Sequence, residues 1–280
     1  MRQTFAKAGL RVVSWLDSRS LPRAIAHRQR RNPLVRAVWT RASRPLRWRA
    51  VPILSGPARG MRINLHGSAV AFATGTAERP LQLAIERELR PGATFFDIGA
   101  NVGFMALIAA RAVGPSGRVV AFEPVPENVA AIRENMALNG VDWFEVHEAA
   151  VAEQPGRADL ILSGVSAFSR LASTSTPSEA RGRIEVEVTS IDAFMAAGGP
   201  LPDVVKIDVE GAELEVIAGM RGMLERHRPV ILCEVHDSNA AYAELMGSLG
   251  YAPLNLDGEL PVQDAGRNAH TIARPLGGSG

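Results

Sequence analysis

The sequence predicts an α/β protein in which a doubly wound, mostly parallel sheet carries helices on both faces. From residue 94 onward, short apolar runs of strand length alternate with helical segments. The central runs are continuously apolar, as in strands buried on both faces, and glycine and proline separate them from the helices. These observations together favour a parallel sheet covered by helices.

Composition sets limits on the class of protein. The chain has 280 residues, of which 46% are hydrophobic, as is ordinary for a globular protein. The single cysteine, Cys233, cannot form an internal disulfide, so we expect a reducing compartment and a packing role for its thiol. No apolar run reaches the length of a membrane span, and we therefore expect a cytoplasmic protein that is not integral to a membrane.

Charge divides the chain into a basic extension, residues 1–50, and a mildly acidic domain, residues 51–280. The extension holds 13 Lys/Arg residues and one acidic residue, Asp17, whereas the domain holds 18 basic and 28 acidic residues. We expect the extension to be helical, because an apolar face recurs at helical spacing near the N-terminus. It could lie on an anionic membrane surface, peripheral at the inner face, through Trp15, Trp39 and Trp48. It could equally dock on its own domain or a partner subunit, or serve as a nucleic-acid arm or transit peptide.

The elements expected in the domain follow in chain order. Residues 51–73 are strand-like with glycine breaks, and a helix over 81–89 ends at Pro91-Gly92. Further strands are expected at 94–96, 118–122, 143–151, 158–162, 183–190, 204–208, 230–235, 251–256 and 270–273. Further helices are expected at 104–111, 126–139, 191–197, from about 212, and at 240–249. The segment Ser163–Gly182 is rich in Ser, Thr and Gly, and we expect a surface loop that covers or selects a bound molecule.

The stretch Thr94–Phe104 joins a strand to a helix through a glycine turn, with the sequence TFFDIGANVGF. This layout brings backbone N–H groups close to a bound cofactor. The spacing of Gly99 and Gly103 differs from the G-x-G-x-x-G of dinucleotide sites. A different nucleotide-like ligand is therefore favoured.

Acidic residues and one histidine stand where the central strands are expected to end, and ligands of doubly wound sheets bind there. These residues are Asp97, Glu123, Asp208, Glu210, Glu234 and His236. Glu123 ends the second strand, about twenty residues past the glycine turn, which suits the two hydroxyls of a ribose. For a lone glutamate the alternative is a helix-capping carboxylate.

Several ordered motifs resemble the FkbM family of S-adenosylmethionine-dependent methyltransferases. They are FDIGANVGF at 96–104, AFEP at 121–124, VVKIDVEGAE at 204–213, GTAE at 75–78, VTSIDAF at 188–194 and RPVILCEVH at 228–236. The resemblance covers residues 60–275 and implies a class I methyltransferase fold with methyl transfer from S-adenosylmethionine. The acceptor it implies is a hydroxyl of a sugar, glycan or glycosylated natural product. A glycolipid acceptor is expected if the basic extension lies on a membrane. Ala77 departs from the family, which more often has an aromatic residue there, whereas Glu78 matches.

The resemblance and the strand-end pattern together give a set of expected site residues. Those expected to bind the cofactor are Glu78, Asp97, Gly99, Asn101, Gly103 and Glu123. Those expected to be catalytic are Lys206, Asp208, Glu210 and His236, because a carboxylate or histidine can take the proton of an acceptor hydroxyl. Lys206, one of two lysines in the chain, could orient the substrate or form a structural ion pair with Asp208 or Glu213.

A metal is not favoured, although Asp208, Glu210 and His236 could instead hold a divalent ion such as Mn²⁺. An RNA methyltransferase that uses the basic extension is an alternative function, but the sequence lacks an Asn-Pro-Pro-Tyr-like element for base amines. A non-catalytic interaction protein is a third alternative, which the intact set of strand-end residues disfavours. The sequence leaves a homo-oligomer open.

Overall fold

The structure is a computed structural model that describes residues 48–163, 169–171 and 180–277. The helix expected near the N-terminus and most of the Ser163–Gly182 loop lie outside these residues. The chain divides into two units, 1–77 and 78–280, which we describe separately. The division expected at residue 50 stays a prediction.

The described part of the first unit begins with a two-stranded hairpin. Strand β1 (Ala50–Pro52) pairs antiparallel with β2 (Arg62–Asn64), and helix α4 (Val70–Thr74) follows. Gly75 ends α4 in the left-handed conformation, where its N–H donates to Phe72 O at 3.2 Å. The expectation of strand-like structure through residue 73 is therefore wrong from Val70 onward.

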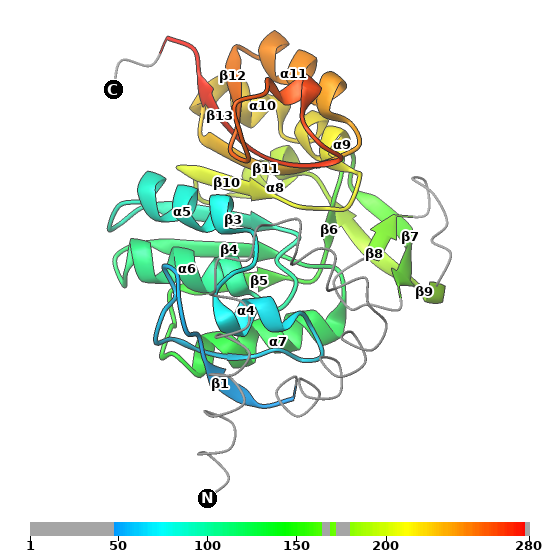
Figure 1. Cartoon of the computed structure of the whole chain (residues 1–280). Helices are drawn as coiled ribbons and strands as arrows, with labels where there is room; N and C mark the ends of the chain where they lie inside the picture. Colours follow the sequence, from blue (N-terminus) through cyan, green and yellow to red (C-terminus); the bar gives the residue numbers. More distant parts are fainter. Residues whose placement is uncertain (1–47, 164–168, 172–179, 278–280) are drawn as a thin grey trace, which may run out of the picture. The chain divides into compact units, whose positions relative to one another are not determined.

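Among the described residues of the second unit, seven strands form one sheet, in the order β12-β13-β11-β10-β3-β4-β5 (Figure 1). Their bounds are β3 Thr94–Ile98, β4 Arg118–Phe122, β5 Phe144–His147, β10 Val204–Ile207, β11 Val230–His236, β12 Tyr251–Asn255 and β13 Asn268–Pro275. The strands β11, β10, β3, β4 and β5 are parallel, and β13 runs antiparallel to both of its neighbours. The prediction of a mostly parallel sheet is confirmed.

The strand order reverses at the centre of this sheet. After β3 the chain adds β4 and β5 on one side, and it then returns to place β10 on the other side of β3. At such a switch point the loops that follow neighbouring strands diverge and leave a crevice beyond their carboxyl ends. The strand-end residues singled out in the sequence lie around this point.

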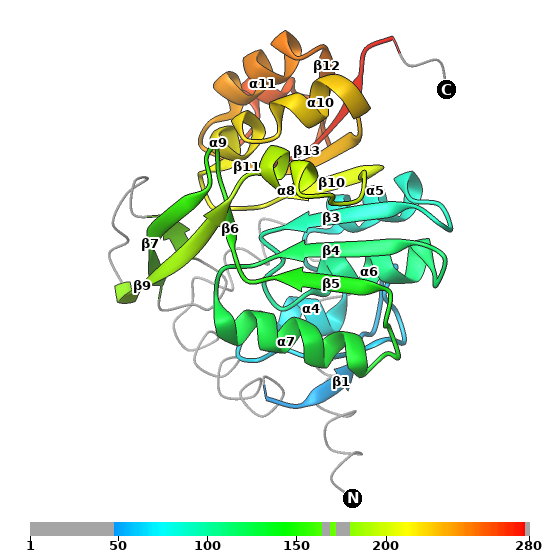
Figure 2. The same cartoon turned by 180° about the vertical axis from the view of Figure 1, so that it is seen from behind.

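Helices cover both faces of the sheet, as predicted. Figure 1 shows α5 (Arg79–Glu88) and α6 (Phe104–Val113) on one face, and α7 (Pro126–Ala137) joins β4 to β5. Figure 2 shows α8, α9, α10 and α11 on the opposite face. Their bounds are Ile191–Ala196, Glu213–Ala218, Arg221–His227 and Asn239–Ser248, and a short 3-10 helix, η2, spans Val262–Asp264.

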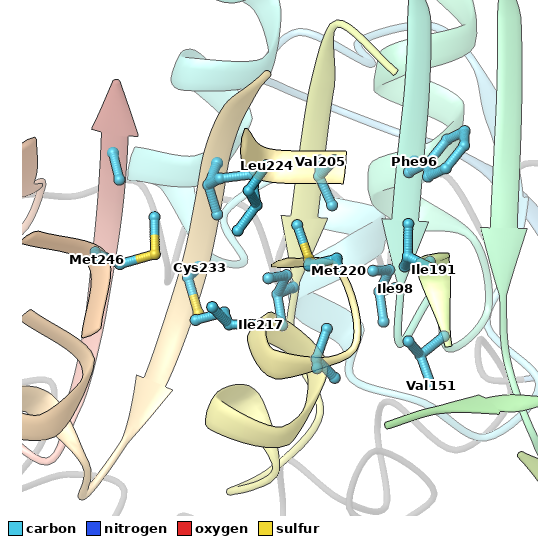
Figure 3. Packing of buried hydrophobic residues seen from close by; sticks show 14 of the residues in the cluster. Phe96, Ile98, Val151, Ile191, Val205, Ile217, Met220, Leu224, Cys233 and Met246 are labelled. Atoms are coloured by element: carbon cyan, nitrogen blue, oxygen red, sulfur yellow. The ribbon is translucent and has the colours of Figure 1, made fainter. Parts of the chain in front are cut away.

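A buried apolar cluster fixes the second set of helices to the sheet. Val205 and Cys233 project from β10 and β11 toward Ile217 and Met220 (Figure 3). Ile217 lies on α9, and Met220 lies between α9 and α10. Cys233 is fully buried, and burial raises the pKa of its thiol well above the ordinary value. The cysteine therefore packs as a small apolar residue, as expected.

A second, four-stranded sheet is inserted between β5 and α8, in the order β6-β9-β7-β8. Its strands are β6 Ala150–Val151, β7 Gly156–Ser163, β8 Ser169–Leu171 and β9 Ala180–Thr189. Strand β7 pairs antiparallel with β8 and β9, and β6 pairs parallel with β9. Figure 2 shows β7 and β9 beside the arrowheads of the central strands, so the small sheet stands at the carboxyl edge of the large one.

Candidate active site

The glycine turn after β3 packs against the end of β10. Gly99 and Gly103 have φ values of 75° and 82°, and Asn101 between them also lies in the left-handed region at 52°. A Cβ atom on Gly99 would stand 1.9 Å from the carbonyl oxygen of Asp208. Only glycine allows this approach, so the turn and the end of β10 are fitted to each other.

Glu123 follows directly after β4, and its side chain reaches the same turn. Its carboxylate accepts hydrogen bonds from Asn101 N at 2.8 Å, Val125 N at 3.1 Å and Asn128 Nδ2 at 3.1 Å. Burial raises the pKa of Glu123 to about 7, although these donors act in the opposite direction. A buried carboxylate so held is suited to accept further hydrogen bonds from a ligand.

Lys206 lies beneath the turn and is almost fully buried. Its Nζ donates to Gly99 O at 2.9 Å, and it lies 3.1 Å from Asp97 Oδ1 and 3.5 Å from Asp208 Oδ2. Burial alone lowers the pKa of Lys206, but the charges of Asp97 and Asp208 outweigh it and raise the pKa above its ordinary value. The group is therefore a fixed cation that joins β3, the turn and β10, and it pairs with Asp208 rather than with Glu213.

His236 is the last residue of β11 and is held by Glu213, a residue that the sequence suggested only as a partner of Lys206. Its Nδ1 lies 2.8 Å from Glu213 Oε1, and the side chain of Glu213 is 0% exposed. The opposite ring nitrogen, Nε2, lies 3.5 Å from Glu210 Oε2 and 3.6 Å from Glu234 Oε1. Burial lowers the pKa of His236, but the hydrogen bond to Glu213 and the charge of Glu210 outweigh it and raise that pKa to about 9.

Glu78 brings another carboxylate to the same place from the start of α5. One oxygen each of Glu78, Asp208 and Glu234 lie within 4.8 Å of one another. Burial, followed by the charge of Asp208, raises the pKa of Glu78 to about 8. Glu78 and Glu210 have φ values of 43° and 54°, and such backbone strain is found most often at functional sites.

A cavity opens between these strand ends and the four-stranded sheet. It is lined on the large sheet by Gly99, Asn101, Glu123, Asp208 and Glu210, and on the small sheet by Ala150, Val151 and Leu160. Of the other residues expected at the site, Asp97 and Lys206 lie buried behind this lining, and Gly103 begins α6 against Ile132. The structure thus brings the expected residues to one region, with His236 beside Glu210.

The order of the sheet, the glycine turn and the acidic strand end define an S-adenosylmethionine-dependent methyltransferase of the class I fold. The chain belongs to the FkbM methyltransferase family, because residues 97–253 match the family model described as the methyltransferase FkbM domain.

Three relatives illustrate the family. The chain is 28% identical over 214 residues to 31-O-demethyl-FK506 methyltransferase FkbM of Streptomyces tacrolimicus, covering 66% of this chain and 82% of the relative. It is 29% identical over 188 residues to 2-O-methyltransferase NoeI of Sinorhizobium fredii, covering 60% and 76%. It is 30% identical over 151 residues to hexuronic acid methyltransferase AglP of Haloferax volcanii, covering 50% and 55%.

The residues present fit S-adenosylmethionine. Glu123 offers a carboxylate at the cavity wall for the ribose hydroxyls, and the turn around Gly99 offers backbone groups. The cofactor also carries a positive sulfonium, and the carboxylates of Glu78, Asp208 and Glu234 gather at this edge with Lys206 already balanced by Asp97. An acidic environment of this kind stabilises a cation.

Among the described residues, no helix combines the length and the hydropathy needed to cross a membrane.

Proposed function

We propose that the enzyme transfers a methyl group to a hydroxyl of a sugar, glycan or glycosylated natural product. The names of the relatives support this acceptor class: one carries a 2-O-methyltransferase name, one acts on a hexuronic acid, and one on 31-O-demethyl-FK506. The observation that carries the proposal is the convergence of Asp208, Glu210 and His236 within 4.8 Å of one another beside the cavity.

In the proposed cofactor half of the site, Glu123 accepts hydrogen bonds from the ribose hydroxyls. The backbone at Gly99 and the side-chain amide of Asn101 bind the methionine portion, while Asp97 and Gly103 stabilise the conformation of the turn. When bound, S-adenosylmethionine supplies an electrophilic methyl group on a sulfonium. A positive charge at this point favours the ionised form of Glu78, and the Glu78 carboxylate at the start of α5 in turn stabilises that charge.

In the proposed acceptor half, His236 helps to orient the hydroxyl, and the proton of the hydroxyl is received by one of two carboxylates, Asp208 and Glu210. These groups can accept hydrogen bonds from a hydroxyl, and holding the oxygen in line with the methyl group supplies much of the rate enhancement. Lys206 acts as a positioning residue, since its ammonium is fully engaged by Gly99, Asp97 and Asp208.

The charge of the site supports a neutral, hydroxyl-bearing acceptor over a nucleic acid. Glu123, Asp208 and Glu210 line the cavity, and carboxylates repel a phosphodiester backbone while they accept hydrogen bonds from hydroxyls. The basic extension over residues 1–50 then has a different proposed role, which is contact with an anionic membrane surface that carries a lipid-linked acceptor.

An acceptor screen with methyl-labelled S-adenosylmethionine tests the proposal. Candidate acceptors are free sugars, glycolipids, glycosylated natural products and RNA, with the Asp208→Asn variant run in parallel. We expect label in an alkali-stable ether of a sugar or a glycosylated product, and none with the variant. Label transferred to RNA and to no hydroxyl compound of the other classes would contradict the proposal.

A further inference from the structure

The imidazole of His236 is fixed from one side by a buried carboxylate. Because an ionised carboxylate can only accept, the 2.8 Å hydrogen bond to Glu213 Oε1 places the proton on Nδ1 of the histidine. The same oxygen also accepts from Gly211 N at 2.7 Å, so the carboxylate itself is held in place. In the neutral ring, which is the form that ligates a metal, this arrangement leaves the lone pair on Nε2 and directs it away from Glu213; binding of a cation there displaces the second proton of the imidazolium.

That nitrogen faces a group of carboxylates rather than a hydrogen-bond partner. The side chain of His236 is 4% exposed, and within the described part of the chain Nε2 has no hydrogen bond. It lies 3.5 Å from Glu210 Oε2 and 3.6 Å from Glu234 Oε1. Oxygens of two acidic residues therefore lie at ion-pair distance from a buried nitrogen that makes no hydrogen bond to any residue that the structure describes.

The backbone brings a third polar side chain, that of Asp208, to the same point. Asp208 and Glu210 follow β10, where the chain turns through Glu210 at φ 54° and Gly211 at φ 102°. Without this turn, alternation along an extended chain would keep the two side chains on one side but carry them apart. In the turn, one atom each of Asp208, Glu210 and His236 lie within 4.8 Å of one another.

We propose that Asp208, Glu210 and His236 bind a divalent cation through two carboxylate oxygens and Nε2, with Glu213 orienting the imidazole. Three such ligands around an ion with bonds of about 2.1 Å sit roughly 3 to 4 Å apart, and the 3.5 Å between His236 Nε2 and Glu210 Oε2 falls in this range. A carboxylate hydrogen-bonded to the far nitrogen of a ligating histidine is a recurrent support in metal sites. Two oxygens and one nitrogen suit Mn²⁺ or a similar ion.

An ion at this point would lower the pKa of a hydroxyl bound to it, and in this respect the inference rests on the proposed function. The binding of the ion itself does not depend on the acceptor. Cation binding is therefore measured without an acceptor, so that its failure and the failure of hydroxyl methylation are separate results.

The experiment is a titration of the full-length protein, treated with EDTA and desalted, with Mn²⁺ alone. Electron paramagnetic resonance follows the signal of free Mn²⁺, which falls as the ion binds. We expect one site in the wild type, and pulsed measurements on that sample should detect coupling to an imidazole nitrogen. This second signature requires no variant. A wild-type protein that binds no Mn²⁺, or binds it without nitrogen coupling, would overturn the inference.

Two matched pairs of variants locate the site. His236→Ala should abolish binding, and Glu213→Gln should weaken it roughly 10- to 100-fold, because the imidazole loses the group that orients it. The controls, His227→Ala and Glu225→Gln, change exposed residues of α10 and should bind as the wild type does. Thermal melts and binding of S-adenosylhomocysteine verify that each variant is folded.

A neighbouring group of three carboxylates is an alternative binding site for the ion, and a variant of it distinguishes the two sites. Glu78, Asp208 and Glu234 also lie within 4.8 Å of one another but contain no histidine. If the ion binds where we propose, Glu78→Gln should leave the affinity for Mn²⁺ within about twofold of the wild type. Binding that survives His236→Ala but is lost with Glu78→Gln would overturn the assignment.

Discussion

The ammonium of Lys206 donates a 2.9 Å hydrogen bond to the carbonyl of Gly99. Through this contact the strand end that precedes Asp208 is tied to the turn that lines the cavity. The two halves of the proposed site, donor and acceptor, therefore share one buried cation.

Replacing Lys206 with methionine should destabilise the protein strongly. The substitution leaves the carboxylates of Asp97 and Asp208 without their cation, and an uncompensated buried charge costs about 3–5 kcal/mol. Urea unfolding measures the loss, and Arg133→Met, at an exposed position of α7, is the control, with an expected change of about 0.5 kcal/mol or less. Equal stability of Lys206→Met and the wild type would show that the ion pairs do not stabilise the fold.

Glu123 should make cofactor binding depend on pH. Its pKa is raised to about 7, so the ionised form, which in our proposal accepts hydrogen bonds from the ribose hydroxyls, becomes dominant as the pH rises through that value. Calorimetry with S-adenosylhomocysteine should show affinity about tenfold higher at pH 8 than at pH 6. With Glu123→Gln the affinity should be lower, and this step should disappear. If the variant showed the same change in affinity between pH 6 and pH 8, another titrating group would be responsible for the change.

The same shift has a consequence for folding. Because burial raises the pKa of Glu123 above its value in the unfolded chain, its contribution to stability is complete below about pH 4.5 and is lost as the pH rises through about 7. Comparing the pH dependence of urea unfolding in the wild type and in Glu123→Gln should isolate this contribution. The two profiles should diverge between these pH values, and parallel profiles would show that Glu123 titrates normally.

Asp208→Asn should separate binding from turnover. The variant keeps the size of the side chain, so affinity for S-adenosylhomocysteine should remain within a few-fold of the wild type. Turnover should fall by at least 10²-fold, because the neutral amide neither takes a proton nor orients the hydroxyl as the carboxylate does. Both quantities are measured on one preparation with the acceptor found in the screen. Wild-type turnover in this variant would remove Asp208 from the catalytic set.

Gly99→Ala should disturb the turn more than the same change elsewhere. The new Cβ would lie 1.9 Å from Asp208 O, so the turn must move away from β10. Gly140→Ala is the matched control, because Gly140 also has a positive φ, 65°, but no atom within 4 Å of the added Cβ. The control should cost about 1–2 kcal/mol in urea unfolding, and Gly99→Ala should cost more and also weaken cofactor binding. Equal costs would argue against a close fit between turn and strand.

The basic extension should bind anionic vesicles in a salt-dependent manner. Each Arg near such a surface contributes about 1 kcal/mol, so replacing Arg28, Arg30 and Arg31 together with Gln should weaken binding by about two orders of magnitude at low salt. Sedimentation with vesicles of phosphatidylserine and phosphatidylcholine measures this on the full chain. Neutral phosphatidylcholine vesicles are the control, and equal binding to both would contradict an electrostatic contact.

Features encoded locally could be predicted from the sequence. The strands around Asp97 and Lys206 are apolar runs bounded by glycine or proline, and the strand expected at 118–122 has the bounds of β4. Site residues at the ends of such strands are therefore predictable. Helix α4 was not predicted, because its five residues carry no periodic pattern and it ends at a glycine that equally indicates a turn.

The pairing of Glu213 with His236 could not be found in this way. The two residues belong to different elements, and Glu213 reaches the histidine only because the chain turns at Gly211 before α9. In the sequence, Glu213 is one of two glutamates at the start of a helix and is readily explained as a favourable charge near the helix N-terminus. A signal would have been its full burial, which the sequence alone does not give.

The four-stranded sheet has a consequence for how such an enzyme diversifies. All four strands come from one uninterrupted stretch, residues 150–189, whereas the large-sheet side of the cavity is built from loops after β3, β4 and β10. Substitutions or insertions within that stretch reshape one wall of the cavity and leave the opposite wall untouched. If the proposed function holds, grafting the corresponding stretch of a relative should change the acceptor while the residues proposed to bind the methyl donor stay the same.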